Sequence, residues 1–150
     1  MVSFRRQVGD THIVCALHSK RSPSDAEWDE YLGHIRDARE LTRGGIGAVG
    51  AVAVTDGGAP DAAQRKRLAE VVRGWAPVGA VISESLLVRG VVTALAWLGI
   101  PVRSFPVTEV SAALAWAAVP ESEHEALLAD INVLAKTLDG GVRTAEELIA

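Results

Sequence analysis

Short apolar segments alternate with segments of helical periodicity along this chain. Charge-free runs rich in valine and alanine, at 49–54 and 78–82, each precede a segment whose apolar residues recur every three or four positions. This alternation is typical of βαβ units, whose right-handed crossovers build a mainly parallel sheet covered by helices. The sequence therefore predicts an α/β fold with a mixed, mainly parallel sheet of four or five strands.

The first two strands are predicted to be antiparallel. Residues 4–8 and 11–17 are rich in β-prone residues, and the turn pair Gly9-Asp10 separates them. Two such runs joined by a glycine-containing pair are typical of a β-hairpin. The second run is continuously apolar, which indicates a strand covered on both faces.

A long helix is predicted to follow the hairpin. Ser24 and Glu27 have the spacing of a capping box, in which each side chain satisfies a backbone N–H of the first turn. Gly44-Gly45 is predicted to end this helix. The apolar residues at helical spacing, expected on its buried face, are Trp28, Tyr31, Leu32 and Ile35.

The same reasoning predicts the remaining elements. Helices are expected at 61–73, 86–98, about 108–118 and about 120–139, with a strand at 102–105 and a short helix or frayed tail at the end. The expected cap residues are Ser83, Glu84, Ser85, Thr108, Ser122 and Glu125. No linker-like composition interrupts the chain, so one domain is expected over 1–150, with a core at about 3–118 and an additional C-terminal helix at about 120–139.

Composition excludes several classes of protein. With 49% hydrophobic residues and a net charge of −4 the chain is not intrinsically disordered. The mildly acidic balance argues against nucleic-acid binding, which depends on neutralising phosphates with cations. A single cysteine excludes an internal disulfide framework. The sequence shows neither a signal-peptide core nor an apolar run of about 20 residues, so a cytoplasmic protein without membrane insertion is expected.

One motif resembles a dinucleotide-binding fingerprint but lies in the wrong context. Gly45, Gly47 and Gly50 match the pattern G-x-G-x-x-G. A nucleotide site needs these glycines between a strand and a following helix, so that the phosphates meet the helix N-terminus. Here they follow a helix and precede a strand, which favours a turn leading into a strand.

Side chains for metal binding or nucleophilic catalysis form no recognisable pattern. The four histidines are expected on four different elements and lack metal-ligand spacing, and Cys15 lies within an apolar strand where a buried, inert thiol is expected. The sequence thus predicts no metal, no cofactor, no catalytic residue and no enzymatic activity. The histidines are His12, His18, His34 and His124.

Two loops are candidates for a binding surface. Ligands and partners of open α/β sheets lie beyond the carboxyl ends of the strands, where segments 55–61 and 83–85 are expected. Their acidic side chains argue against phosphate binding. The predicted partner-binding residues are Thr55, Asp56, Gly57, Gly58, Asp61, Ser83, Glu84 and Ser85; the alternative is that they serve only as turn and cap residues.

With this order of elements, residues 3–118 resemble the STAS superfamily, the fold shared by anti-sigma-factor antagonists and sulfate-transporter tails. The resemblance rests on the opening hairpin, the strand at 49–54 with its loop and helix to 72, and segments 78–98 and 102–116, which are similar to stand-alone bacterial members. It implies a non-enzymatic regulatory domain that binds a protein partner in signalling. A homodimer is left open as a further possibility.

The chain departs from the regulatory members at their phosphorylation site. Those members carry an Asp-Ser-x-Gly-type motif at the start of the second helix, where a partner kinase phosphorylates the serine. The corresponding residues here are Asp61, Ala62, Ala63 and Gln64. Since alanine cannot accept phosphate, the chain is expected to bind its partner constitutively, through the loop at 56–61 and the helix after it.

Two other functions are left open by the sequence. Apolar residues around Trp97 and Trp116 would suit a small-molecule or lipid-binding domain. An α/β enzyme would need a pair of titratable groups in a pocket, and no such pair is obvious in the sequence.

Overall fold

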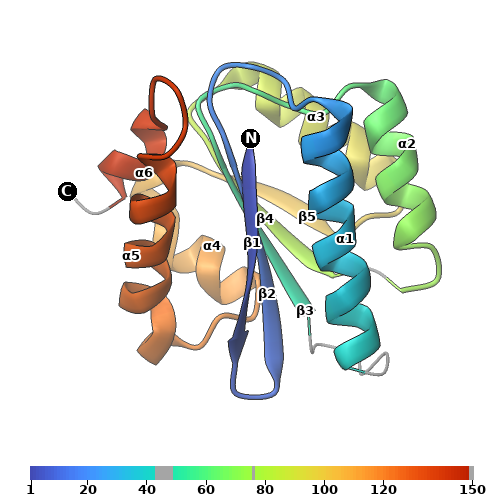
Figure 1. Ribbon diagram of the computed structural model, residues 1–150, viewed down its shortest axis with the longest axis horizontal. Helices are drawn as coiled ribbons and strands as arrows, with labels where there is room; N and C mark the ends of the chain where they lie inside the picture. Colours follow the sequence, from blue (N-terminus) through green and yellow to red (C-terminus); the bar gives the residue numbers. More distant parts are fainter. Residues whose placement is uncertain (43–48, 76, 149–150) are drawn as a thin grey trace.

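A five-stranded sheet forms the centre of the computed structural model, which describes residues 1–42, 49–75 and 77–148 (Figure 1). The strands β1 and β2 pair antiparallel, and β2 to β5 pair in parallel in chain order, which confirms the predicted α/β fold and its opening hairpin. Their bounds are β1 Val2–Val8, β2 Thr11–His18, β3 Val49–Thr55, β4 Val78–Ile82 and β5 Val102–Phe105.

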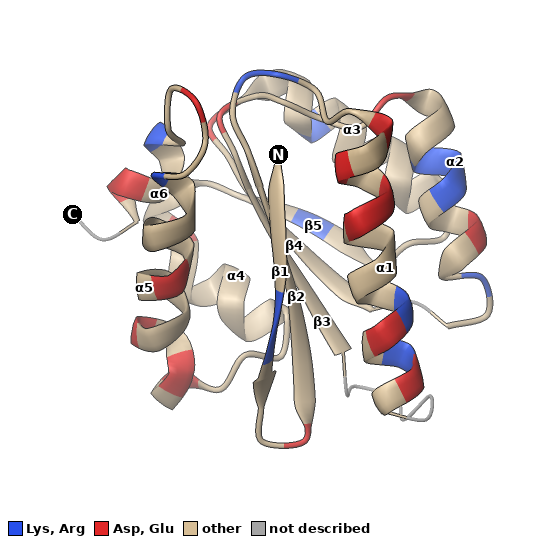
Figure 2. Cartoon of the chain, viewed as in Figure 1, with Lys and Arg blue, Asp and Glu red and all other residues tan. Residues whose placement is uncertain are grey.

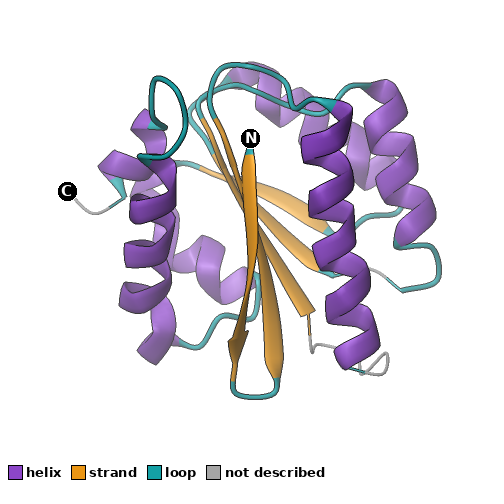
Figure 3. Ribbon diagram, in the orientation of Figure 1, coloured by secondary structure: helices purple, strands orange, loops and turns teal. Residues whose placement is uncertain are grey.

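Helices cover both faces of the sheet (Figures 1 and 3). Because the strands follow one another in space, successive right-handed crossovers put α1, α2 and α3 on the same face. The C-terminal helices α4, α5 and α6 cover the other face. The helices are α1 Asp25–Leu41, α2 Ala62–Val71, α3 Leu86–Trp97, α4 Val110–Trp116, α5 His124–Ala135 and α6 Arg143–Glu147. In the described residues no helix combines the length and apolarity needed to cross a bilayer.

Strand β2 shows how one segment supplies two hydrophobic cores. Its side chains alternate between the faces of the sheet, so Ile13, Cys15 and Leu17 pack beneath the C-terminal helices. Val14 and Ala16 face α1 and its neighbours. A strand buried in this way has no polar side, which explains the continuous apolar run that marked it in the sequence.

The predicted start of α1 is confirmed in detail. The Ser24 hydroxyl accepts a hydrogen bond from Glu27 N at 3.3 Å, and the Glu27 carboxylate accepts one from Ser24 N at 2.7 Å. The predicted core residues of this helix are buried. Helix α1 ends at Leu41, while the proposed stop at Gly44-Gly45 lies outside the described residues, as do Gly45 and Gly47 of the glycine motif.

The predicted caps of the later helices are wrong. Thr108 lies inside a short 3₁₀ turn, Val107–Glu109, and α5 begins at His124 after a similar turn, Glu121–Glu123. In the described residues neither α4 nor α5 has a side-chain cap. The preceding prolines fix the first backbone angle and accept hydrogen bonds from Glu109 N and Glu123 N, so the tight turn replaces the cap.

Most of the predicted core is confirmed. Val81 is an exception, since it is only half-buried on β4. The other predicted core residues outside α1 are buried, namely Val52, Val54, Leu68, Val72, Ile82, Leu95 and Leu114. The sequence thus identified buried positions on each of the helices α1, α2 and α3.

Candidate functional site

The two predicted loops lie side by side at the carboxyl end of the sheet. Strands β3 and β4 are parallel neighbours that end at Thr55 and Ile82, which brings segments 55–61 and 83–85 together. A buried hydrogen bond joins them, because the Ser83 hydroxyl donates to the Thr55 carbonyl oxygen at 2.7 Å. The structure thus assembles these residues at one edge, and their partner-binding role stays a prediction.

The turn after β3 is held by its own residues. The Thr55 hydroxyl donates to the Gly58 carbonyl at 2.6 Å and accepts from Gly57 N at 3.0 Å. Gly57 has a φ of +130°, which residues with a side chain rarely adopt. Gly58 packs against backbone carbonyls of the segment after β2, where a Cβ atom would collide with Ser19 and Arg21. The turn is therefore rigid, and its buried hydroxyl is already engaged.

Asp56 caps a helix from the opposite end of the chain. Its carboxylate accepts hydrogen bonds from Arg143 N and Thr144 N, each at 2.8 Å, and from the Thr144 hydroxyl at 2.7 Å. These donors belong to the first turn of α6, where backbone N–H groups lack helical partners. Asp56 therefore fixes α6 to the end of β3.

Asp56→Ala is expected to destabilise the fold by about 1–2 kcal/mol, because the substitution removes the cap and leaves the partly buried N–H of Thr144 without a partner. Urea denaturation measures the loss, and hydrogen exchange should show it concentrated in α6. Asp37→Ala, on the exposed side of α1, is the matched control and should change stability by less than about 0.5 kcal/mol. Equal stability of both variants would contradict this role.

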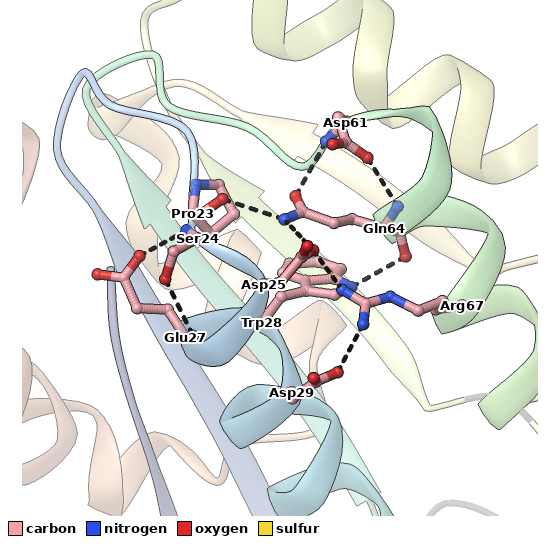
Figure 4. Close-up of polar contacts among 9 residues, drawn as sticks. All are labelled: Pro23, Ser24, Asp25, Glu27, Trp28, Asp29, Asp61, Gln64 and Arg67. Atoms are coloured by element: carbon pink, nitrogen blue, oxygen red, sulfur yellow. Dashed lines mark hydrogen bonds and ion pairs between the residues drawn. The ribbon is translucent and has the colours of Figure 1, made fainter.

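Asp61 is the N-cap of α2 and forms a second capping box with Gln64 (Figure 4). Gln64 N donates to the Asp61 carboxylate at 2.8 Å, and Asp61 N donates to the Gln64 side-chain oxygen at 3.1 Å. The side-chain amide nitrogen of Gln64 donates a hydrogen bond to the Pro23 carbonyl oxygen, and the backbone carbonyl oxygen of Gln64 accepts one from the Trp28 indole at 2.9 Å. These bonds fix α2 to α1, a role of Gln64 that the sequence analysis missed.

The third acidic residue also satisfies a backbone donor. Glu84 accepts a hydrogen bond from Val107 N at 2.8 Å. Ser83 accepts from Ser85 N at 3.1 Å, whereas the Ser85 hydroxyl, expected to cap α3, forms no cap bond within the described residues. All three carboxylates of the two loops are thus held in place by internal hydrogen bonds.

The solvent-facing side of α3 is apolar. Leu86 is 76% exposed, Leu87 80% and Trp97 85%, and Leu98 follows at the end of the helix. The sequence of α3 contains a single charged residue, Arg89. Figure 2 shows the contrast with α1 and α2, which carry charged residues along their length. A surface helix normally presents charged or polar residues to water, so this face is unusual.

We define the α3 face by the residues opposite the buried Val88, Val92 and Leu95. At 100° per residue these are Leu86, Leu87, Arg89, Gly90, Thr93, Ala94, Trp97 and Leu98, with Arg89 and Leu98 at opposite edges of the face. The helix and Trp97 were predicted from the sequence, whereas the apolar outer side of the helix was not. This face could have been predicted by projecting residues 86–98 on a helix, because apolar residues then lie on nearly every side.

A partly open, apolar pocket of about 80 Å³ lies between the sheet and helices α1, α2 and α3. His18, the last residue of β2, lines it and is 4% exposed. In the described part of the chain His18 Nδ1 is buried and forms no hydrogen bond. Burial, together with the nearby N-terminal ammonium, lowers the pKa of His18 from 6.5 to about 4, so the imidazole is neutral at pH 7.

The histidines and the cysteine differ partly from expectation. His12 and His18 share strand β2, so the prediction of four different elements is wrong. Among the described residues no three His, Cys, Asp or Glu side chains gather where they could hold a metal ion. Cys15 is fully buried, as predicted, and burial raises the pKa of its thiol well above the ordinary value.

The five-stranded mixed sheet, with its antiparallel hairpin and helices between parallel strands, is the α/β fold expected from the order of elements in the sequence. An architecture alone does not assign a function, because one fold can serve many. Membership of the superfamily stays a hypothesis, since no family model, curated protein or solved structure matches this chain.

Proposed function

We propose that this chain is a non-enzymatic protein-interaction domain, similar to anti-sigma-factor antagonists of the STAS superfamily, that binds through the α3 face. One observation carries the proposal: large apolar side chains on a nearly uncharged helix are exposed to solvent, with Leu87 80% and Trp97 85% exposed. Contiguous exposed apolar surface of this kind marks interaction sites in soluble proteins.

A second copy of the chain is the partner that suits this face. Large side chains stand at both ends of α3, and the small residues Gly90 and Ala94 lie between them. In an antiparallel pair of α3 helices, a two-fold axis sets Trp97 of one copy opposite Leu87 of the other. The small central residues allow the two backbones to approach closely. The predicted segment 83–85 leads directly into this surface.

The start of α2 supports binding without a phosphorylation switch. Ala62, its first residue, has no hydroxyl group, and the neighbouring Asp61 carboxylate is engaged as the helix cap. Association is therefore set by protein concentration and not by a phosphate at this position.

Leu87→Glu is expected to weaken self-association by at least about 30-fold, because charging a large apolar side chain that the interface buries costs about 2 kcal/mol or more. Sedimentation velocity over a concentration series measures the dissociation constant of the dimer. The matched control is Val133→Glu, which places the same charge at a 64% exposed apolar position on α5, outside the α3 face. This control should dimerise as the wild type does.

Two results would contradict the proposal. One is a wild-type chain that stays monomeric up to millimolar concentration. The other is a dimer that Leu87→Glu and Val133→Glu affect equally, since that would place the interface elsewhere or reduce it to a general effect of charge.

A further inference from the structure

Strand β5 forms one edge of the sheet and, in the described residues, pairs with β4 alone. In a parallel ladder the two backbone groups of a residue point to the same side, and successive residues alternate. The carbonyl oxygens of Pro101 and Phe105 accept hydrogen bonds from N–H groups near the two ends of β4, so the backbone groups of Val102 and Ser104 face outward. The Val102 N–H is bonded to the Ile100 carbonyl at 2.9 Å. The open edge therefore presents the Val102 carbonyl and both backbone groups of Ser104.

Arg103 places a cation beside this edge. Its exposed side chain lies over two aromatic rings, 4.7 Å from the ring centroid of Trp116 and 5.5 Å from that of Phe105. The Trp116 ring is fixed, because its indole N–H donates to the Gly79 carbonyl at 3.1 Å. No carboxylate of the described residues forms an ion pair with Arg103. Stacking occupies the faces of the guanidinium, whereas its N–H donors lie in its plane and stay free for a carboxylate.

A second copy of the chain suits this edge poorly. The antiparallel pairing that would use Val102 and Ser104 of both copies sets Arg103 of one copy directly opposite Arg103 of the other. Like charges directly opposite each other destabilise a strand pair. Pro101 and Pro106 bracket the strand, which limits the pairing of two long edges. The same features favour a short segment of opposite charge.

We propose that the β5 edge binds an extended acidic peptide segment of another protein, which adds a strand to the sheet. Its backbone pairs with Val102 and Ser104, and the carboxylate of a glutamate or aspartate lies opposite Arg103. In an antiparallel pairing the two residues beside the carboxylate face the α3 side, where Val102 packs, so apolar side chains suit them. This inference goes beyond the α3 face and does not depend on it.

The test titrates the full chain at pH 7 with a blocked pentapeptide that has glutamate at its centre, valine on either side and threonine at both ends. Saturable shifts are expected at the Ser104 amide and the Trp116 indole N–H. Arg103→Gln should weaken binding about fivefold, equivalent to about 1 kcal/mol, the upper part of the range for an opposite-charge pair across two strands. Arg36→Gln removes the same charge from the exposed side of α1 and is the matched control, which should bind as the wild type does.

Two further measurements test the backbone pairing. Ser104→Pro removes the outward N–H at an edge position where proline is tolerated, and it should abolish the shift of the Trp116 indole. A peptide with N-methylated valines lacks the donors that face the Val102 carbonyl and Ser104, and it should not bind the wild type. This second result does not depend on the folding of a variant.

Several outcomes would overturn the inference. Absence of saturable shifts in the wild type, or equal affinity of the wild type and Arg103→Gln, would remove the acidic partner. Equal affinity for a peptide with lysine in place of glutamate would do the same. Unchanged binding of the N-methylated peptide would show that no strand is added. Shifts of the Ser104 amide that appear on raising the protein concentration without peptide would assign the edge to a second copy.

Discussion

Gly50→Ala is expected to destabilise the protein by more than about 3 kcal/mol, the upper part of the range for overpacked cores. Gly50 lies in β3, and a Cβ atom at this position would fall well inside van der Waals distance of the Ala117 carbonyl oxygen, just after α4. The obstacle is backbone, which cannot rotate away as a side chain would. Since small domains are stable by about 5–15 kcal/mol, a large share of the stability would be lost. Urea denaturation gives the value.

Gly33→Ala is the matched control for this prediction. Gly33 lies within α1, and no atom would come within 4 Å of an added Cβ. Because alanine favours helix over glycine, this variant should be more stable than the wild type by about 0.5–1 kcal/mol. If Gly50→Ala and the wild type had the same midpoint urea concentration of unfolding, this would contradict the close packing of the α4 C-terminus on β3.

Acid is expected to destabilise the fold through His18 by about 3 kcal/mol in total. Burial lowers the pKa of His18 to about 4, whereas in the unfolded chain it has the ordinary value of 6.5. Above pH 6.5 the ring is neutral in both states and contributes nothing. Between pH 6.5 and 4 the unfolded chain binds a proton that the folded chain does not, so stability falls as the pH falls. Denaturation at intervals across this range measures the slope.

His18→Leu should remove most of this slope, and His34→Gln, a half-buried position on α1, should keep it. The remainder comes from His12, whose pKa is lowered by burial and by Arg5. Both variants should still lose stability further below pH 4.5. The pKa of Glu27 in the folded chain is lowered by its hydrogen bonds with Arg21, the N-terminal ammonium and Ser24. Below pH 4.5 the unfolded chain therefore binds a proton at Glu27 that the folded chain does not, and stability falls. A slope between pH 6.5 and 4.5 that is unchanged in His18→Leu would contradict the burial of this histidine.

Local patterns were enough to predict the layers of the fold. Strands β2 and β3 are buried on both faces and so appear as uncharged runs, and the Ser24–Glu27 box involves residues three apart. The cap of α6 could not be predicted in this way, because Asp56 and Arg143 are 87 positions apart and meet only through the folded sheet. Segments 55–61 and 83–85 were predicted to form a binding surface, whereas the structure shows the carboxylates of Asp56, Asp61 and Glu84 bonded to backbone N–H groups at the starts of helical turns.

The remaining candidate sites differ in how far the sequence could reveal them. The α3 face follows from helical periodicity once the buried side is known from Val88, Val92 and Leu95. The pocket depends on how small residues of three strands add up beneath three helices, which requires the arrangement in space. The predicted second strand ends at residue 17, and only the structure shows His18 as the buried end of β2.

The position of α3 in the proposed dimer can be measured directly by spin labelling. Ala96 is exposed beside the α3 face, and a label on Ala96→Cys should react alone because Cys15 is 0% exposed. Packed helices lie about 8–10 Å apart, so double electron–electron resonance should give label separations within roughly 25 Å. Labels on Val133→Cys of α5 serve as the comparison and should be much farther apart. A dimer whose residue-96 labels lie beyond roughly 35 Å, or a sample without any dimer signal, would contradict binding through α3.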